Sequence, residues 1–118
     1  MNEASESTEL QRSTQLTRVV DAPEVTGVVL LAIDTALGTS VALGANGRIV
    51  EASSDDPLRH AEALGGMLRQ VFDAAGVAPD AVTGVVVGIG PGPFTGLRVG
   101  IAAAQAFALG RGVPPLPL

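Results

Sequence analysis

The segment that most constrains the fold is a valine-rich run that enters a turn of glycine and proline and then an almost wholly apolar stretch. Residues 85–87 are a β-branched run, which is typical of a buried strand. Residues 88–93 are nearly all Gly and Pro, and residues 94–109 contain few polar side chains. The pattern predicts a strand, a tight turn and a helix, an order that phosphate-binding folds also use.

The expected helix over residues 94–109 is apolar around its whole circumference. Its main polar residues are Arg98 and Gln105. A helix that is apolar on every side is buried on every side. A sheet covers only one side of such a helix, and a neighbouring helix covers part of another. We therefore expect a further domain or a second chain to cover the remaining side of the helix. The alternative is that this side packs inside the chain's own core.

Composition limits what else the chain contains. With 118 residues it is one domain at most. Residues 1–27 are rich in acidic residues, Ser, Thr and Gln, which predicts a disordered acidic tail. The chain has no Cys, and its seven basic residues, all Arg, form no stripe of the kind that binds nucleic acid. No run approaches the ~18 apolar residues of a membrane helix, and we expect a cytoplasmic location without a membrane partner.

Three strands are predicted between the tail and the first helix. Residues 28–33, 39–43 and 48–53 have strand-like patterns. The pair Asn46-Gly47 separates the last two runs, and this dipeptide is a strong hairpin signal. The three runs are therefore expected to form an antiparallel meander.

A helix over residues 58–75 is predicted from its apolar spacing and from signals at both ends. Acidic residues precede Pro57 at the expected start, and Gly76 follows the last apolar position. The order is then β-β-β-α-β-α, an α/β fold. A further strand should follow, but residues 113–118 contain three prolines, which are excluded from central strands. We therefore expect this proline-rich end to be a point of truncation.

The turn of residues 88–93 has two interpretations. Successive backbone N–H groups before a helix bind anions, so phosphate binding is one of them. A Walker A loop is excluded because the chain has no Lys, and a dinucleotide fingerprint because no acidic residue follows Asp80. Alternatively, the glycines serve close packing and the acid that ends the first strand forms an Asx turn. The candidate phosphate nest consists of Asp34, Thr35, Gly90, Gly92 and Thr95.

No catalytic residue and no metal site are predicted. His60 and Glu62 are ligand types, but residues two apart point to nearly opposite sides of a helix. The chain has no second His and no Cys to complete a site.

Three ordered blocks resemble the TsaB family, also called YeaZ and often placed beside the M22 peptidases. The blocks are VVLLAIDTALGTSVAL, RHAEAL and GIGPGPFTGLRVGIAAAQAFA, and they lie within residues 28–112. The last block is highly specific. The resemblance implies the actin-like, heat-shock-ATPase (RNase H-like) fold, of which residues 28–112 would be the N-terminal lobe, truncated before a second lobe.

The resemblance also implies a role and partners. TsaB-like proteins are non-catalytic subunits that pair with a metal-binding paralogue, TsaD, which transfers a threonylcarbamoyl group to the adenosine beside the tRNA anticodon. A TsaE-like ATPase belongs to the same machinery. The implied complex uses ATP and a metal, neither of which this chain is expected to bind alone, and it contacts tRNA as a whole. A homodimer is a further expected form.

In that family the pairing surface lies on the two helices that match residues 58–75 and 94–109. The interface residues expected on them are His60, Leu64, Met67, Leu68, Val71, Leu97, Arg98, Ile101, Ala104, Gln105 and Ala108. Two alternatives to an accessory subunit stay open. One is an M22-type peptidase or nucleotide-binding enzyme, which would need a metal site or an ATP cradle, and the other is a non-functional gene fragment.

Overall fold

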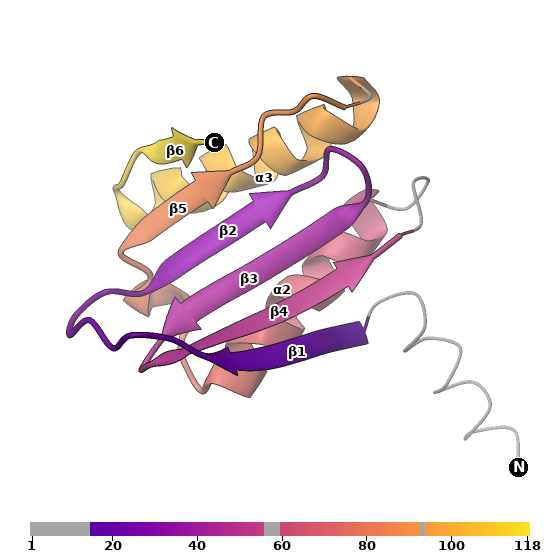
Figure 1. Ribbon diagram of the computed structural model, residues 1–118. Helices are drawn as coiled ribbons and strands as arrows, with labels where there is room; N and C mark the ends of the chain where they lie inside the picture. The colour runs from indigo at the N-terminus through magenta and orange to yellow at the C-terminus, as the bar shows by residue number, and fades with distance from the viewer. Residues whose placement is uncertain (1–14, 56–59, 93) are drawn as a thin grey trace, which may run out of the picture.

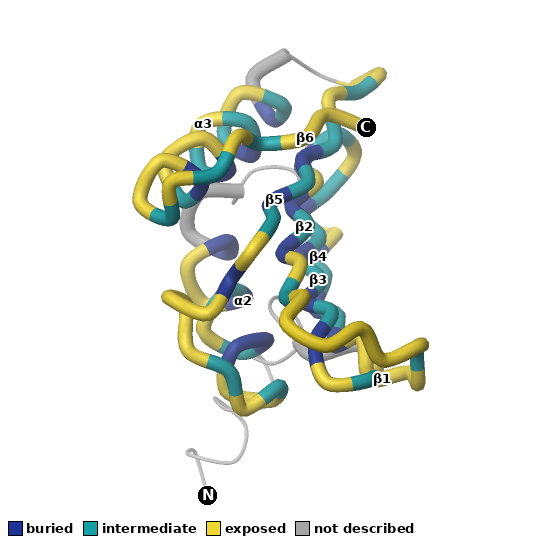
Figure 2. Tube along the Cα trace, turned by 90° about the vertical axis from the view of Figure 1, so that its left-hand side faces the viewer, coloured by how far each residue is buried: buried dark blue, intermediate teal, exposed yellow. Residues whose placement is uncertain are grey.

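A mixed six-stranded sheet carries two helices on one of its faces (Figure 1). The computed structural model describes residues 15–55, 60–92 and 94–118. Seen along the sheet, both helices lie on the same side and the opposite side of the sheet is open (Figure 2). The described part of the chain is therefore a two-layer α/β fold.

The elements are named here in chain order. The strands are β1 (Gln15–Asp21), β2 (Leu30–Asp34), β3 (Thr39–Ala45), β4 (Arg48–Ser54), β5 (Gly84–Val87) and β6 (Pro115–Pro117). The helices are α2 (His60–Ala75), the short 3-10 helix η1 (Pro79–Ala81) and α3 (Phe94–Arg111). The order across the sheet is β1-β4-β3-β2-β5-β6, with β5 parallel to both of its neighbours and the other pairs antiparallel. The predicted order β-β-β-α-β-α is confirmed from β2 to α3.

The predicted turn signals are also confirmed. Asn46 and Gly47 have φ angles of 55° and 77°, and they join β3 to β4 as a two-residue hairpin turn. Gly76 follows the last residue of α2 with φ 68°, and Gly112 follows α3 with φ 71°. Both glycines supply the left-handed conformation that ends a helix. The expected start of α2 at Asp56 and Pro57 lies outside the described residues.

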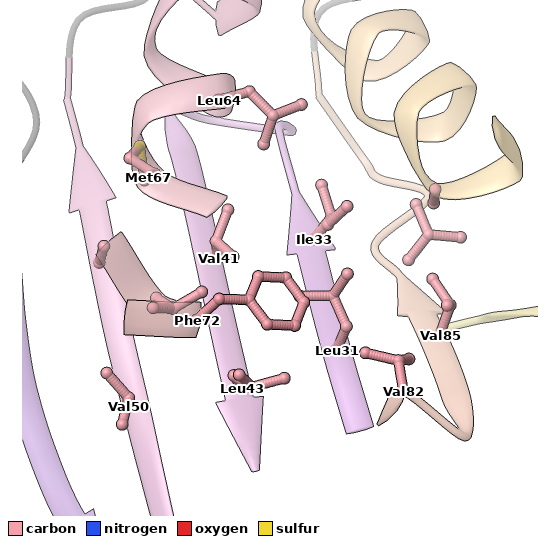
Figure 3. Packing of buried hydrophobic residues seen from close by; sticks show 14 of the residues in the cluster. Leu31, Ile33, Val41, Leu43, Val50, Leu64, Met67, Phe72, Val82 and Val85 are labelled. Atoms are coloured by element: carbon pink, nitrogen blue, oxygen red, sulfur yellow. The ribbon is translucent and has the colours of Figure 1, made fainter. Parts of the chain in front are cut away.

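The core lies between the sheet and the two helices (Figure 3). Alternate residues of the central strands point toward the helices, as a period of two requires. The sheet contributes Leu31, Ile33, Val41, Leu43, Val50, Ala52, Val85 and Val87, and the helices contribute Ala63, Leu64, Met67, Val71, Phe72, Ala104 and Ala108. The rings of Phe72 and Phe107 stack with centroids 5.9 Å apart, which joins α2 to α3. None of the helices that the structure describes is long and apolar enough to cross a membrane.

β1 corrects the prediction of a disordered tail over residues 1–27. Residues 15–21 pair antiparallel with β4 along its length, whereas residues 1–14 lie outside the described part. Composition predicts disorder when a segment cannot bury enough apolar surface. An edge strand needs little burial, because backbone hydrogen bonds to its neighbour hold it in place. One face of such a strand can stay exposed to solvent.

β6 corrects the expectation that no strand follows α3. Pro115 and Pro117 pair with Val85 and Val87 at the outer edge of the sheet. The backbone N–H of Leu118 donates to the carbonyl of Val87 over 2.9 Å. Because N–H directions alternate along a strand, the two proline nitrogens point away from β5, where no donor is needed. The prolines exclude a central strand but not this edge position.

Replacing Leu43 with Ala is expected to lower the free energy of unfolding by about 2–5 kcal/mol, because it leaves a cavity at a wholly buried position. The matched control is Leu37, which is 83% exposed in the turn between β2 and β3. Leu37→Ala should change the same quantity by less than about 0.5 kcal/mol. Urea unfolding followed by circular dichroism measures both, and equal losses would contradict the position of Leu43 in the core.

Candidate functional site

The end of β2 is tied to the first turns of α3 by one buried side chain. The hydroxyl of Thr35, which is wholly buried, donates to the carbonyl of Gly96 and accepts from the N–H of Gly100 over 3.0 Å. Gly96 and Gly100 are four residues apart, so this hydroxyl bridges the two groups that an α-helix normally pairs directly. Thr35 is therefore a structural link between the sheet and the helix.

Asp34 forms the Asx turn that the sequence offered as one interpretation. Its Oδ1 accepts from the backbone N–H of Ala36 over 2.8 Å. The side chain is exposed, and the carboxylate lies so close to Gly88 that a Cβ on that glycine would overlap it. The acid thus fixes the turn after β2 and approaches the turn before α3.

The glycines of residues 88–93 are closely packed, Gly92 against the turn between β2 and β3 and Gly90 against α3. A Cβ on Gly92 would overlap the carbonyl oxygen of Ala36 and lie 2.9 Å from its carbonyl carbon. Gly90 has φ 110°, and a Cβ there would lie 3.2 Å from a methyl group of Leu97. These contacts support the packing interpretation of the glycines, since a larger residue at Gly92 would push the two turns apart and one at Gly90 would press on Leu97.

The structure brings the candidate phosphate-nest residues together only in part and forms no evident anion site from them. Asp34 and Gly90 line one hollow, the hydroxyl of Thr35 is hydrogen-bonded to Gly96 and Gly100 of α3, and Gly92 faces the carbonyl of Ala36. The side chain of Thr95 lies outside the described residues. A carbonyl oxygen faces Gly92, and a carbonyl repels a phosphate. The neighbouring hollow of about 400 Å³ is lined by the two carboxylates Asp34 and Asp55, and none of its described lining residues is basic. Within the described residues, no group of three metal-ligand side chains occurs either.

α3 has two different faces. Small residues at intervals of four, Gly96, Gly100, Ala104 and Ala108, are buried and face the sheet. The opposite face is exposed and is called the uncovered stripe here. It consists of Arg98, Ala102, Gln105, Ala106 and Leu109. Leu109 is 83% exposed, so the chain's own described residues leave one side of this apolar helix uncovered.

The structure corrects five of the expected interface residues. Leu64, Met67, Val71, Ala104 and Ala108 are at most 5% exposed in the chain's own core, where a partner could not contact them. Helical spacing identifies these positions as apolar but does not say whether the sheet or a partner covers them. On a helix that is apolar on all sides, hydrophobicity alone does not show which side meets the sheet.

The remaining expected interface residues lie nearer the surface. Arg98 and Gln105 are exposed, Leu68, Leu97 and Ile101 are half-buried, and the side chain of His60 is outside the described part. Ala102, Ala106 and Leu109 are exposed on α3 but are not among the interface residues expected from the sequence. Their signal was present in the small residues repeating every four positions, because these mark the face of α3 that approaches the sheet closely.

The strand order and the two helices on one face define a lobe of the actin-like ATPase fold. The family model of TsaD, described as tRNA N6-adenosine threonylcarbamoyltransferase, matches residues 57–118, just over half of the 118 residues. The chain therefore belongs to this family. No curated protein matches it.

Within the family the chain is similar to YeaZ. It is 40% identical to YeaZ from Pseudomonas aeruginosa with a TM-score of 0.74, over 77% of this chain and 43% of that one. A crystal structure of an uncharacterized protein with similarity to peptidase YeaZ from Pseudomonas aeruginosa gives the same values. The predicted TsaB (YeaZ) resemblance is thus confirmed, and the chain spans less than half the length of these relatives.

Gly100→Ala is expected to lower the free energy of unfolding by about 1–2 kcal/mol, although Ala favours a helix. The new Cβ would overlap Oγ1 of Thr35 and lie 3.0 Å from its Cγ2. Gly110 is the control in the same helix, because a Cβ there meets nothing within 4 Å. Gly110→Ala should raise stability by up to about 1 kcal/mol. Thermal unfolding compares the two, and a stabilising Gly100→Ala would show that Thr35 does not fix α3.

Proposed function

We propose that this chain is a non-catalytic subunit that supports threonylcarbamoyl transfer to the adenosine beside the tRNA anticodon, by pairing with a TsaD-like paralogue. The observation that carries the proposal is the uncovered stripe of α3. Family membership supports the same role. In this proposal ATP, the metal and the tRNA are bound by the complex, to which a TsaE-like ATPase also belongs.

The uncovered stripe has the composition of a partner surface. Ala102, Ala106 and Leu109 are apolar and exposed, and Gln105 lies among them. Burying a leucine that is 83% exposed contributes about 1.5–3 kcal/mol to association. Two small alanines one turn apart leave room for a partner helix to lie close to α3. Such a surface favours contact between helices.

Two glycines in α2 support the same interpretation. Gly65 and Gly66 are exposed, and a Cβ at either position would meet no atom within 4 Å. Each glycine costs a helix about 1 kcal/mol relative to Ala, and nothing in the described chain requires its small size. Gly65 is two turns before Phe72 and so points to nearly the same side of α2 as this residue, which stacks on Phe107 of α3. Its small size suits a helix that approaches both α2 and α3.

Leu109→Glu is expected to weaken association with the TsaD-like protein of the same organism by at least about tenfold, because an unpaired carboxylate would be buried at the contact. Leu37→Glu is the matched control, since both leucines are 83% exposed and only Leu109 lies on α3. Analytical size exclusion and calorimetry measure the association, and thermal unfolding checks that both variants fold.

Loss of association in both variants, or in neither, would contradict a contact through the uncovered stripe. A folded unmodified chain that never binds the TsaD-like protein, when a full-length YeaZ-like protein does, would remove the proposed function itself.

Substitutions at Gly65 test whether a partner helix comes close. Gly65→Ala should raise the melting temperature of the chain alone, while Gly65→Leu should weaken association with the TsaD-like protein by about tenfold or more. Leu37→Glu is again the control, because Leu37 is exposed in the turn between β2 and β3 and belongs to neither helix. Calorimetry measures the affinities. Unchanged affinity for Gly65→Leu would mean that the partner does not approach this part of α2.

A further inference from the structure

β1 lies at the edge of the sheet beside β4 (Figure 1). Their pairing runs from Gln15 opposite Ser53 to Asp21 opposite Arg48, so β1 covers almost all of β4. The pairing continues past the strand, where the N–H of Ala22 donates to the carbonyl of Gly47 over 2.8 Å. β4 therefore has a neighbour on both of its sides.

β4 would be a regular open edge if β1 were detached. Its pairing with β3 is unbroken from Thr39 opposite Ser54 to Ala45 opposite Arg48, and it contains no proline. A long, regular edge strand presents a row of unpaired N–H and C=O groups, which is a template for pairing with another chain.

β1 is a much poorer template than β4. Its register shifts between Leu16 and Arg18, which marks an irregularity of the bulge type. Charge does not distinguish the two strands, because Arg18 and Asp21 lie opposite Glu51 and Arg48 of β4, with Arg18 Nε 3.5 Å from Glu51 Oε1. Pro23 follows the strand closely. Bulges and prolines at an edge are features by which proteins prevent edge-to-edge pairing with another chain.

We propose that β1 is an edge cover, which keeps β4 from pairing with β4 of a second copy of this chain. The excluded contact is antiparallel and two-fold symmetric, because the same strand of each copy then meets its equivalent and the assembly closes as a dimer. This surface is separate from the uncovered stripe of α3, so the proposal does not depend on the proposed function.

The hairpin turn shows which backbone groups of β1 hold the cover in place. Asn46 and Gly47 form a two-residue turn, so Ala45 and Arg48 exchange the closing hydrogen bonds between β3 and β4. The N–H direction alternates along β4, and Ile49 and Glu51 therefore point their N–H groups toward β1.

The register partners of Ile49 and Glu51 are Val20 and Arg18. In an antiparallel pair of this kind both residues direct their N–H groups at each other's strand. Val20 and Arg18 thus donate toward β4, whereas Val19 between them directs its N–H outward. A proline at Val19 removes a donor that the cover does not use.

In the full chain, Arg18→Pro combined with Val20→Pro is expected to detach β1 and to strengthen self-association by more than about tenfold relative to the unmodified chain. Multi-angle light scattering over a concentration series measures the mass. Hydrogen exchange of Ile49, Glu51 and Ser53 should show amides that stay protected in the dimer. The matched control, Val19→Pro, should behave like the unmodified chain.

The proposal is overturned if the double variant keeps the mass of the unmodified chain while those three amides lose protection, or if Val19→Pro associates equally well. Adding Ile49→Lys to the double variant should restore the original mass, because a lysine on an edge strand opposes pairing; a dimer that persists argues against β4 as the contact. Loss of the circular dichroism signal would mean that the double variant does not fold. Arg18→Pro alone, which removes one of the two donors, then replaces it in the same mass and hydrogen-exchange measurements.

Discussion

The hydroxyl of Thr35 is the interaction on which the rest of the structure depends. It joins the end of β2 to the carbonyl of Gly96 and the N–H of Gly100, which sets the position of α3 over the sheet. The neighbouring glycines are consequences of this link, because the turn before α3 must pass close to the turn after β2. A glycine- and proline-rich turn before a helix can therefore arise from packing alone, and the acid that ends β2 forms an Asx turn.

Once α3 is held in this way, its two faces have different roles. The small residues toward the sheet allow close approach, and the larger apolar surface at Leu109 faces outward. α2 repeats the pattern, with Met67 in the core and Gly65 at the surface. The two helices thus present an exposed layer above the core, which connects the internal packing of the lobe to its proposed pairing with a TsaD-like subunit.

Much of this fold could be predicted from the sequence because its signals are local. Asn46-Gly47 specifies a hairpin, Gly76 ends a helix, and the valines of β5 specify a buried strand. The errors concern relations between distant segments. The pairing of residues 15–21 with β4 has no local signal. Hydrophobicity does not distinguish the faces of α3, and only the size of the residues at intervals of four marks the face with Ala104 that the sheet covers.

The small residues on the inner face of α3 also determine the entropy of docking that helix. Gly and Ala lose no rotamer freedom when they are buried, so Gly96, Gly100, Ala104 and Ala108 make the helix–sheet contact at little cost in side-chain entropy. The long side chain of Gln105 lies outside that contact and is not ordered by it. The contact with the sheet thus fixes the axis of α3. The outward side chains of α3 would lose rotamer entropy only when another surface covers them.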